Sequence, residues 1–234
     1  MKALIVQDLE KSYFLQENKI PVLNKLSFTA TLGEITVLLG RSGCGKTTLL
    51  RLLSGLEVAD AGTISIPPTK KVGMMFQEAR LMPWLTCEEN IAFGLPKNYD
   101  QKYIDNLIKT VGLEDFKKAY PTQLSGGMQQ RAALARTLAQ HSDIILMDEP
   151  FAALDYFTRL QMQQEVLRIK DMLGTGIIFV THNIDEALAI GDKILVMDKG
   201  KISQEIYVPK VSDRDVLQEP FISFKKQILQ ALMY

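Results

Sequence analysis

Short apolar runs recur along the chain and alternate with segments of helical periodicity. The runs are rich in Val, Ile and Leu and predict strands at residues 3–6, 25–30, 35–39, 63–66, 72–76, 144–147, 177–180, 194–197 and 202–206. Apolar positions three and four residues apart predict helices near 49–53, 104–111, 128–140, 155–173, 184–190 and 211–234. This alternation predicts an α/β fold with a mainly parallel sheet that is covered on both faces.

Helical signals replace strand signals between about residues 88 and 140. Apolar residues at helical spacing precede Gly112, which suits a C-terminal cap, and Leu124 opens a second helix rich in Ala, Gln, Leu and Arg. No internal repeat, low-complexity run or long flexible linker interrupts the sequence. We therefore expect one domain over 1–234, with a helical subdomain at about 88–140 inserted in the core and a short tail at about 207–234.

A glycine-rich stretch follows the predicted strand at 35–39 and precedes a predicted helix. It consists of Gly40-Arg41-Ser42-Gly43-Cys44-Gly45-Lys46-Thr47-Thr48. Its glycines allow a tight turn, so that successive N–H groups and the N-terminus of the next helix face one anion. Lys46 can then reach the β- and γ-phosphates, and the Thr47 hydroxyl can bind Mg²⁺. The spacing and both flanks predict a phosphate-binding P-loop rather than an ordinary glycine-rich loop.

Composition narrows the class of protein. Lys plus Arg equals Asp plus Glu, 27 each, so the net charge of zero gives no indication of a nucleic-acid partner. The only two cysteines, Cys44 and Cys87, argue against a disulfide or zinc framework. No apolar run approaches the ~18–20 residues of a membrane helix, and the first residues do not form a signal peptide. We expect a cytosolic protein that is able to dock on a membrane partner.

Two further predicted strands end in polar side chains. Asp148 and Glu149 follow the strand at 144–147, and His182 follows the strand at 177–180. Ligands of open α/β sheets bind at the carboxyl ends of strands, so these groups are expected near the P-loop. Asp148 suits Mg²⁺, Glu149 suits a general base that activates water, and His182 suits a contact to the γ-phosphate. Taken alone, the two acids would suit a helix N-terminus and the histidine a surface or core position; the P-loop favours catalysis.

Three other features have a structural and a functional interpretation. Ser125-Gly126-Gly127 at a helix start is a second anion site or, equally, a helix cap. Gln77 follows a strand and can bond either Mg²⁺-bound water or backbone. Tyr13 can stack on an adenine or simply pack against the protein. Cys44 is most simply a small residue of the loop and not a nucleophile.

The order of these motifs resembles one family. Along the chain come Tyr13, the stretch 40–48, Gln77, the stretch 124–128, the stretch 144–149, Ala153-Leu154-Asp155 and His182. Over about residues 1–206 the chain resembles the nucleotide-binding subunit of an ATP-binding-cassette (ABC) transporter. The resemblance implies an α/β P-loop NTPase core, an N-terminal antiparallel β subdomain and an inserted α-helical subdomain. It also implies ATP and Mg²⁺ as cofactors and ATP hydrolysis as the reaction.

The resemblance implies a role for each motif. Tyr13 would stack on adenine, and Gln77 would bind Mg²⁺ and sense the γ-phosphate. Ser125 and Gly127 would contact the γ-phosphate held by a second copy, and Asp155 would work across the dimer interface. Two copies would pair head to tail, with each ATP between one P-loop and the other copy's signature helix, which begins at Ser125-Gly126-Gly127. His182 would be the switch histidine.

The resemblance also implies partners and a location. The stretches 75–86, 124–131 and 181–187 are similar to those of ATPases of bacterial nitrate, sulfonate and taurine importers, in which Gln77 to Thr86 would be the docking region. That group implies an integral membrane permease that docks on this region, an extracytoplasmic solute-binding protein, and a peripheral position on the cytoplasmic face of the cell membrane. An exporter shares the same catalytic motifs and remains the alternative. A soluble ABC protein acting on ribosomes or DNA usually has two cassettes, and a small-molecule kinase would need a second substrate motif.

Overall fold

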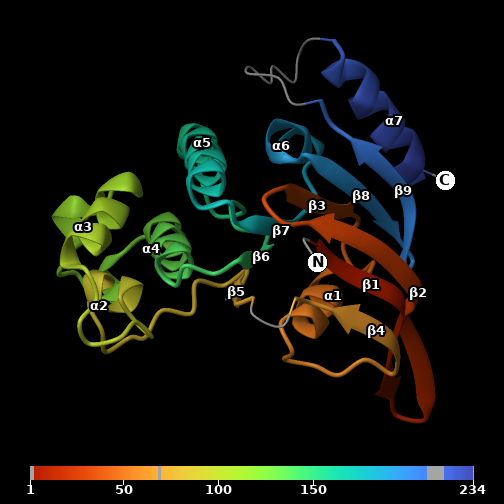
Figure 1. Cartoon of the computed structure of the whole chain (residues 1–234), viewed down its shortest axis with the longest axis horizontal. Coiled ribbons are helices and arrows are strands. Elements are labelled where there is room, and N and C mark those ends of the chain that lie inside the picture. The colour runs from red at the N-terminus through yellow and green to blue at the C-terminus, as the bar shows by residue number, and fades with distance from the viewer. Residues whose placement is uncertain (1–2, 68–69, 210–218, 234) are drawn as a thin grey trace.

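A six-stranded sheet forms the centre of the molecule. The computed structural model describes residues 3–67, 70–209 and 219–233. The central strands are β3 (Ile35–Gly40), β5 (Val72–Met75), β6 (Ile144–Asp148), β7 (Gly176–Thr181), β8 (Lys193–Asp198) and β9 (Lys201–Tyr207). Their spatial order is β5-β6-β7-β3-β8-β9, and only β9 pairs in the antiparallel sense. The prediction of a mainly parallel sheet is therefore confirmed, and Figure 1 shows the strands side by side.

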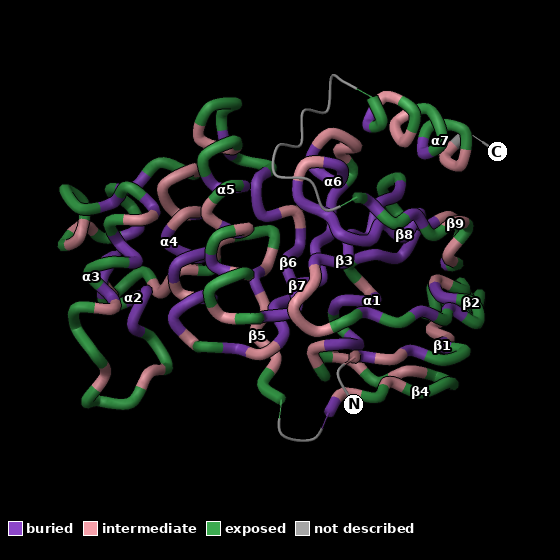
Figure 2. Tube along the Cα trace, turned by 45° about the horizontal axis from the view of Figure 1, so that its top comes forward, coloured by how far each residue is buried: buried purple, intermediate pink, exposed green. Residues whose placement is uncertain are grey.

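Residues of the central strands alternate between two hydrophobic cores, because successive side chains of a strand point to opposite faces. In β3, Val37 and Leu39 belong to one core and Leu38 to the other. In β7, Phe179 and Val180 divide in the same way. Figure 2 shows these strands almost wholly buried. Burial on both faces explains why their sequences are nearly continuous apolar runs rather than alternating patterns.

A second, antiparallel sheet lies on one side of the central sheet. It contains β1 (Ala3–Leu15), β2 (Asn18–Thr31) and β4 (Ala61–Ser65), in the order β2-β1-β4. Sequence patterns predicted only short strands at 3–6 and 25–30. The prediction was too short because the outer part of the β1–β2 hairpin is exposed and its backbone pairing continues without an apolar signal.

Helix α1 (Lys46–Leu53) packs within the core shared by the two sheets. Leu49 and Leu50 are completely buried there, together with Leu4 of β1 and Leu38 of β3. The helix that follows the glycine-rich loop is therefore fixed on several sides. Its N-terminus is the only part that must remain accessible to a ligand.

The segment between β5 and β6 is helical and extends to one side of the sheet (Figure 1). It contains α2 (Cys87–Ile91), α3 (Gln101–Thr110), two 3₁₀ turns (Glu114–Phe116 and Pro121–Gln123) and α4 (Gly126–Ala139). Helix α4 begins two residues before the predicted start, because Ser125 caps it. Helix α2 was not predicted individually, although Thr86 and Glu89 form a reciprocal capping box at its start.

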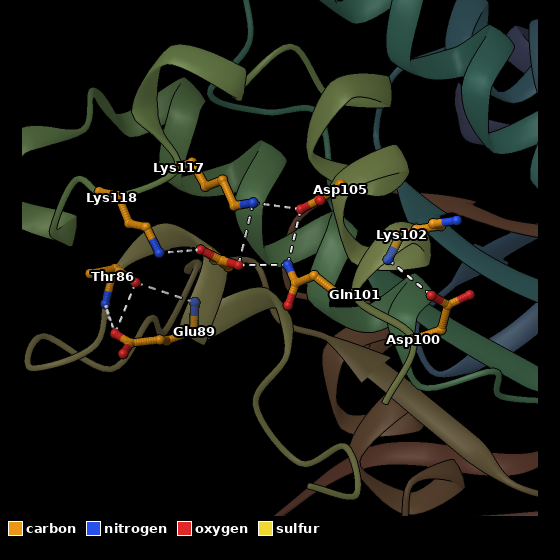
Figure 3. Close-up of polar contacts among 9 residues, drawn as sticks. Thr86, Glu89, Asp100, Gln101, Lys102, Asp105, Lys117 and Lys118 are labelled. Carbon is orange, nitrogen blue, oxygen red and sulfur yellow. Dashed lines mark hydrogen bonds and ion pairs between the residues drawn. The ribbon is translucent and has the colours of Figure 1, made fainter. Parts of the chain in front are cut away.

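A buried carboxylate joins the helices of this segment. Glu88 of α2 is only 8% exposed, and its oxygens lie 3.4 Å from Lys117 Nζ and 2.7 Å from Lys118 Nζ. Gln101 of α3 donates a further hydrogen bond of 2.6 Å to it. Lys117, Lys118 and Gln101 converge on this point in Figure 3. These contacts satisfy a charge that would otherwise be costly to bury.

The remaining helices cover the core on the side of β7–β9. They are α5 (Tyr156–Leu173), α6 (Ile184–Ile190) and α7 (Phe221–Met233). Phe221 and Ile228 anchor α7 in the same core as α6. A tail helix was predicted over 211–234; its part over 211–218 lies outside the described residues, and the observed helix begins at Phe221.

We predict that Phe179→Ala lowers the free energy of unfolding by about 3–5 kcal/mol, because it leaves a large cavity in the middle of the sheet. Phe179 is completely buried and packs against Phe151 at 5.3 Å between ring centroids. Phe14→Ala is the control, since Phe14 is 72% exposed and its truncation should change stability by less than about 0.5 kcal/mol. Urea denaturation measures both, and equal losses would contradict the assignment of this core.

Candidate nucleotide-binding site

The glycine-rich loop connects β3 to α1 and requires glycine at specific points. Gly45 has a φ of 104°, in the left-handed region, and forms the N-cap of α1. A Cβ atom on Gly40 would lie 2.4 Å from the carbonyl oxygen of Met197. Helix α1 has neither a side-chain cap nor an acidic residue in its first turn. Its free N–H groups and positive end are therefore available to an anion.

Lys46 lies folded along this loop. It is only 6% exposed, and its ammonium donates to the carbonyl oxygens of Gly40, at 2.8 Å, and Arg41, at 3.0 Å. These bonds hold a cation at the mouth of the helix. A phosphate at the loop would meet both the ammonium and the backbone donors.

Strand order brings the predicted polar groups to one edge of the sheet. Strand β7 lies between β3 and β6, so the P-loop, the carboxylates at the end of β6 and the histidine after β7 lie at the ends of neighbouring strands. A cavity of about 320 Å³ opens there. It is lined by Val22, Ser42, Gly43, Gly45, Lys46, Thr47, Thr48, Gln77, Glu149 and His182. Val22, from β2, was missed because nothing in its sequence context distinguishes it from a packing residue.

Asp148 is the last residue of β6 and is only 4% exposed. Burial raises the pKa of its carboxyl; the Thr47 hydroxyl acts in the opposite direction, and the charge of Glu149 raises the pKa further. In the described residues, no group of three or more His, Cys, Asp or Glu side chains could hold a metal alone. Mg²⁺ usually completes its shell with phosphates and water, and the hydroxyl, amide and carboxylate oxygens of Thr47, Gln77 and Asp148 suit it.

Glu149 and His182 form a close pair. Glu149 Oε1 lies 3.1 Å from His182 Nδ1, and the carboxylate is 18% exposed. Strand β6 ends at Asp148, and Glu149 adopts a left-handed φ of 46° while its N–H donates to the carbonyl of Val180. This strained turn directs the side chain into the cavity, and strain of this kind is typical of functional sites.

The second predicted anion site lies elsewhere. Ser125 and Gly126 are exposed, and the Ser125 hydroxyl accepts from the N–H of Met128 at 3.3 Å. None of the described residues that line the cavity comes from 125–127. A Cβ on Gly127 would lie 3.4 Å from the carbonyl of Ala153, so this helix start is adjacent to the residues before Asp155. One copy of the chain does not bring its two candidate anion sites together.

Three other predicted residues, Tyr13, Cys44 and Arg41, do not line the cavity. Tyr13 is 37% exposed and hydrogen-bonds through its hydroxyl to Glu57. Burial and this hydrogen bond raise the pKa of the hydroxyl, and Thr48 at the cavity wall acts in the opposite direction. The Cys44 side chain is buried in the core beneath the loop, and burial raises the pKa of its thiol. The Arg41 side chain does not line the cavity.

Comparison with protein families identifies the chain's relatives. The model described as ABC transporter matches residues 23–152, which include the P-loop and both carboxylates at the end of β6. The chain belongs to the ABC transporter family. Among the described residues of this ABC protein, no helix has both the length and the apolar character needed to cross a bilayer.

Individual relatives are similar over most of their length. An aliphatic sulfonates import ATP-binding protein of Pseudomonas syringae is 45% identical and is matched over 83% of this chain and 84% of its own. An uncharacterized ABC transporter ATP-binding protein of Methanocaldococcus jannaschii is 40% identical over 98% and 91%, respectively. A solved dimeric ATP-binding cassette in a post-hydrolysis state with ADP and phosphate superimposes with a TM-score of 0.81 at 29% identity, over 89% of this chain and 100% of its own.

We predict that Asp148→Asn stabilises the folded ABC protein at pH 7 by about 0.5–2 kcal/mol, as is common when a functional group is removed. The raised folded-state pKa of Asp148 favours its protonated form, so the stability from this group is present below the unfolded pKa of ~3.9 and is lost as the pH rises through the folded pKa. The gain should therefore shrink as the pH approaches 4, as measured by chemical denaturation.

Asp143→Asn is a control of opposite sign. Lys70 donates to this exposed carboxylate at 2.6 Å and holds its pKa below the usual range. The stability from Asp143 is present above the unfolded pKa and is lost as the pH falls through the folded pKa. Its variant should be slightly less stable than the parent at pH 7. If Asp148→Asn is less stable than the parent at pH 7, the Asp148 carboxylate does not destabilise the fold through its burial.

Proposed function

We propose that this chain is the ATP-hydrolysing subunit of an ABC importer for a sulfonate or a related small solute. The supporting observation is the cavity in which Lys46 and Thr47 of the P-loop meet the Glu149–His182 pair. Similarity to sulfonate import ATP-binding proteins over most of the chain supports the importer class. We propose the whole of 1–234 as one cassette, with the helical segment at about 88–140 inserted in its core.

Binding of ATP relies on the loop. The N–H groups around Gly43 and Gly45 and the ammonium of Lys46 would hold the β- and γ-phosphates, and Tyr13 would offer its ring to the adenine. Thr47, Gln77 and Asp148 would hold Mg²⁺. When bound, this ion neutralises charge on the phosphates.

Hydrolysis relies on the pair at the ends of β6 and β7. Glu149 would accept the proton of a water molecule as its oxygen attacks the γ-phosphorus, and ADP would leave with the electrons of the broken P–O bond. His182, 3.1 Å from Glu149, would orient that carboxylate and donate a hydrogen bond to the γ-phosphate as charge develops. The partial exposure of Glu149 leaves room for the water.

A second copy would complete the site. Ser125, Gly126 and Gly127 form an exposed helix start with no role in the cavity of their own chain. A solved cassette of the same fold is a dimer with ADP and phosphate. We propose that each ATP is bound between the P-loop of one copy and Ser125 of the other. Asp155 at the start of α5 would lie at the same interface.

A groove beside the sheet would receive the membrane partner. A cavity of about 410 Å³ is lined by residues of the edge strand β5, the loop after it, the segment that follows α2, and the end of α4. It is lined by Gly73, Met74, Phe76, Arg80, Met82, Phe93, Gly94, Arg136, Thr137 and Gln140. Trp84, in the adjoining loop, is 69% exposed. An apolar groove with an exposed aromatic at its edge suits a partner's helix, which we propose belongs to a permease.

The loop from Gln77 to Thr86 is fixed at the wall of this groove. Arg136 of α4 donates to the carbonyls of Ala79, at 2.8 Å, and Arg80, at 2.9 Å. Asn90 accepts from the N–H of Met82 at 2.7 Å and donates to its carbonyl at 3.1 Å. Movement of α4 would therefore move the loop. An extracytoplasmic solute-binding protein would deliver the solute, and this chain would sit peripherally on the cytoplasmic face of the membrane.

We predict that Glu149→Gln binds ATP without hydrolysing it and forms an ATP-dependent dimer, because the amide cannot accept the proton but keeps the shape of the side chain. Size-exclusion chromatography with light scattering should show the mass double from 26.3 kDa. Adding Ser125→Arg should abolish the dimer and leave ATP binding within about twofold, since distant sites act independently. Lys46→Ala should abolish binding itself.

Thr122→Arg is the matched control, since Thr122 is exposed close to Ser125 but outside the helix start. When Thr122→Arg is added to Glu149→Gln, the ATP-dependent dimer should form as in Glu149→Gln alone. An absence of any ATP-dependent dimer in Glu149→Gln would contradict the shared site. Undiminished dimerisation of the Ser125→Arg double variant would contradict the role of α4.

We predict that Met82→Asp weakens association with the permease by about 30-fold, since it places a charge in a largely apolar groove at a cost of ~2 kcal/mol of binding free energy. ATP hydrolysis by the isolated chain should be unchanged. Phe116→Asp, at a 41% exposed position outside the groove, should keep both properties. Co-purification with the detergent-solubilised permease measures association, and equal recovery of both variants would exclude this groove as the docking site.

A further inference from the structure

A small polar cavity lies behind the Glu149–His182 pair. Its volume is about 100 Å³, and it is lined by Glu149, Ala152, Arg159, Thr181, His182, Asn183 and Glu186. Glu149 and His182 also line the cavity beside the P-loop, so this pair forms the wall between the two. The residues that line the second cavity therefore determine how Glu149 and His182 are oriented toward the cavity beside the P-loop.

An ion pair between a buried carboxylate and a partly exposed arginine closes this second cavity. Glu186 of α6 is only 7% exposed, and its Oε1 lies 3.5 Å from Nε of Arg159 in α5. Within the described residues Arg159 Nε is buried and has no hydrogen-bond acceptor, so the carboxylate is its electrostatic partner. The other end of the guanidinium donates to the carbonyl of Leu154 at 3.1 Å. Arg159 therefore connects Glu186 to the residue directly before Asp155.

Glu186 also holds the residues on both sides of His182. Its Oε2 accepts from the Thr181 hydroxyl at 2.6 Å, and the same hydroxyl oxygen accepts from the N–H of Asn183 at 3.0 Å. Asn183 in turn caps α6 by accepting from the N–H groups of Asp185 and Glu186. The backbone that carries His182 is thus fixed through one carboxylate.

Net stabilisation of the fold does not explain why an ion pair occupies this position. Burying the Glu186 carboxylate costs hydration that the contact with Arg159 restores only in part, so the pair contributes little net stability. Burial indeed raises the pKa of Glu186 against the opposing effects of Thr181 and Arg159. An apolar pair would fill the same space, so the charges point to a requirement for defined geometry.

We propose that Arg159 and Glu186 are positioning residues that hold the loop of His182 against the segment of Asp155 and thereby set the Glu149–His182 contact. This inference rests on the proposed function, because Asp155 would lie at the interface with the second copy. The pair would then transmit the position of that interface to the hydrolytic pair of the same chain. Neither residue lines the cavity beside the P-loop.

Steady-state ATP hydrolysis tests the proposal. Glu186→Gln keeps the shape and an acceptor for Thr181 but removes the charge, and Arg159→Met keeps the length of the side chain. Each should lower kcat about tenfold or more while KM for ATP stays within about twofold, since the P-loop is untouched. Arg159→Lys keeps the charge and should regain part of the lost kcat.

Matched controls come from the same helix. Glu165 and Arg168 form an exposed ion pair on α5 at 2.8 Å. Glu165→Gln and Arg168→Met should leave kcat and KM unchanged. Thermal unfolding of every variant separates a loss of fold from a loss of positioning, and only variants with a melting temperature close to the parent's are compared.

Histidine NMR gives a readout that does not depend on hydrolysis. The chain has two histidines, and His141 stacks on Tyr103 at 4.6 Å, away from this network. Glu186→Gln and Arg159→Met should shift the ring signals of His182 and leave those of His141 in place. Glu165→Gln should shift neither.

The two readouts separate the two proposals. Unchanged kcat and an unchanged His182 signal in folded Glu186→Gln would overturn the positioning role. A parent protein that does not hydrolyse ATP would overturn the proposed function instead, and the His182 signal would still decide whether the ion pair positions that ring.

Discussion

The parallel pairing of β6, β7 and β3 is the constraint on which the site depends. Because these strands run in the same direction, their last residues meet at one edge of the sheet. The P-loop, Asp148 and Thr181-His182 lie at the ends of these strands and therefore face one space. The packing of both sheet faces keeps the strands in register, so residues far apart in sequence, such as Glu149 and His182 or Thr47 and Asp148, are held within hydrogen-bond distance without any covalent link.

Several features at this edge oppose stability. Asp148 and Glu186 are buried carboxylates with raised pKa values, and Glu149 occupies a left-handed backbone conformation. The fold tolerates them because the strands beneath are completely buried on both faces. The core stabilises the fold enough to tolerate charged groups in a site with little water. There their electrostatic interactions are stronger than they would be in solvent.

Helix α4 relates this edge to the rest of the surface. Its exposed N-terminus carries Ser125, while farther along it Gln130 and Arg136 donate to backbone carbonyls of the loop that begins at Gln77. A change at the helix start would therefore reach both the P-loop cavity, through Gln77, and the apolar groove. The ion pair of Arg159 and Glu186 makes a comparable link on the other side, between Asp155 and His182.

The sequence alone determined the α/β class, the P-loop and the polar residues after each strand, because glycine spacing, apolar runs and strand ends are local signals. It did not determine the length of the β1–β2 hairpin, whose exposed half lacks an apolar pattern. Only the tertiary structure decided that Glu149 turns into the cavity through a positive φ, that Ser125 lies outside it, and that Arg159 meets Glu186. Those outcomes depend on which strands are neighbours and how helices pack on them, and such distant contacts leave no periodic trace in the chain.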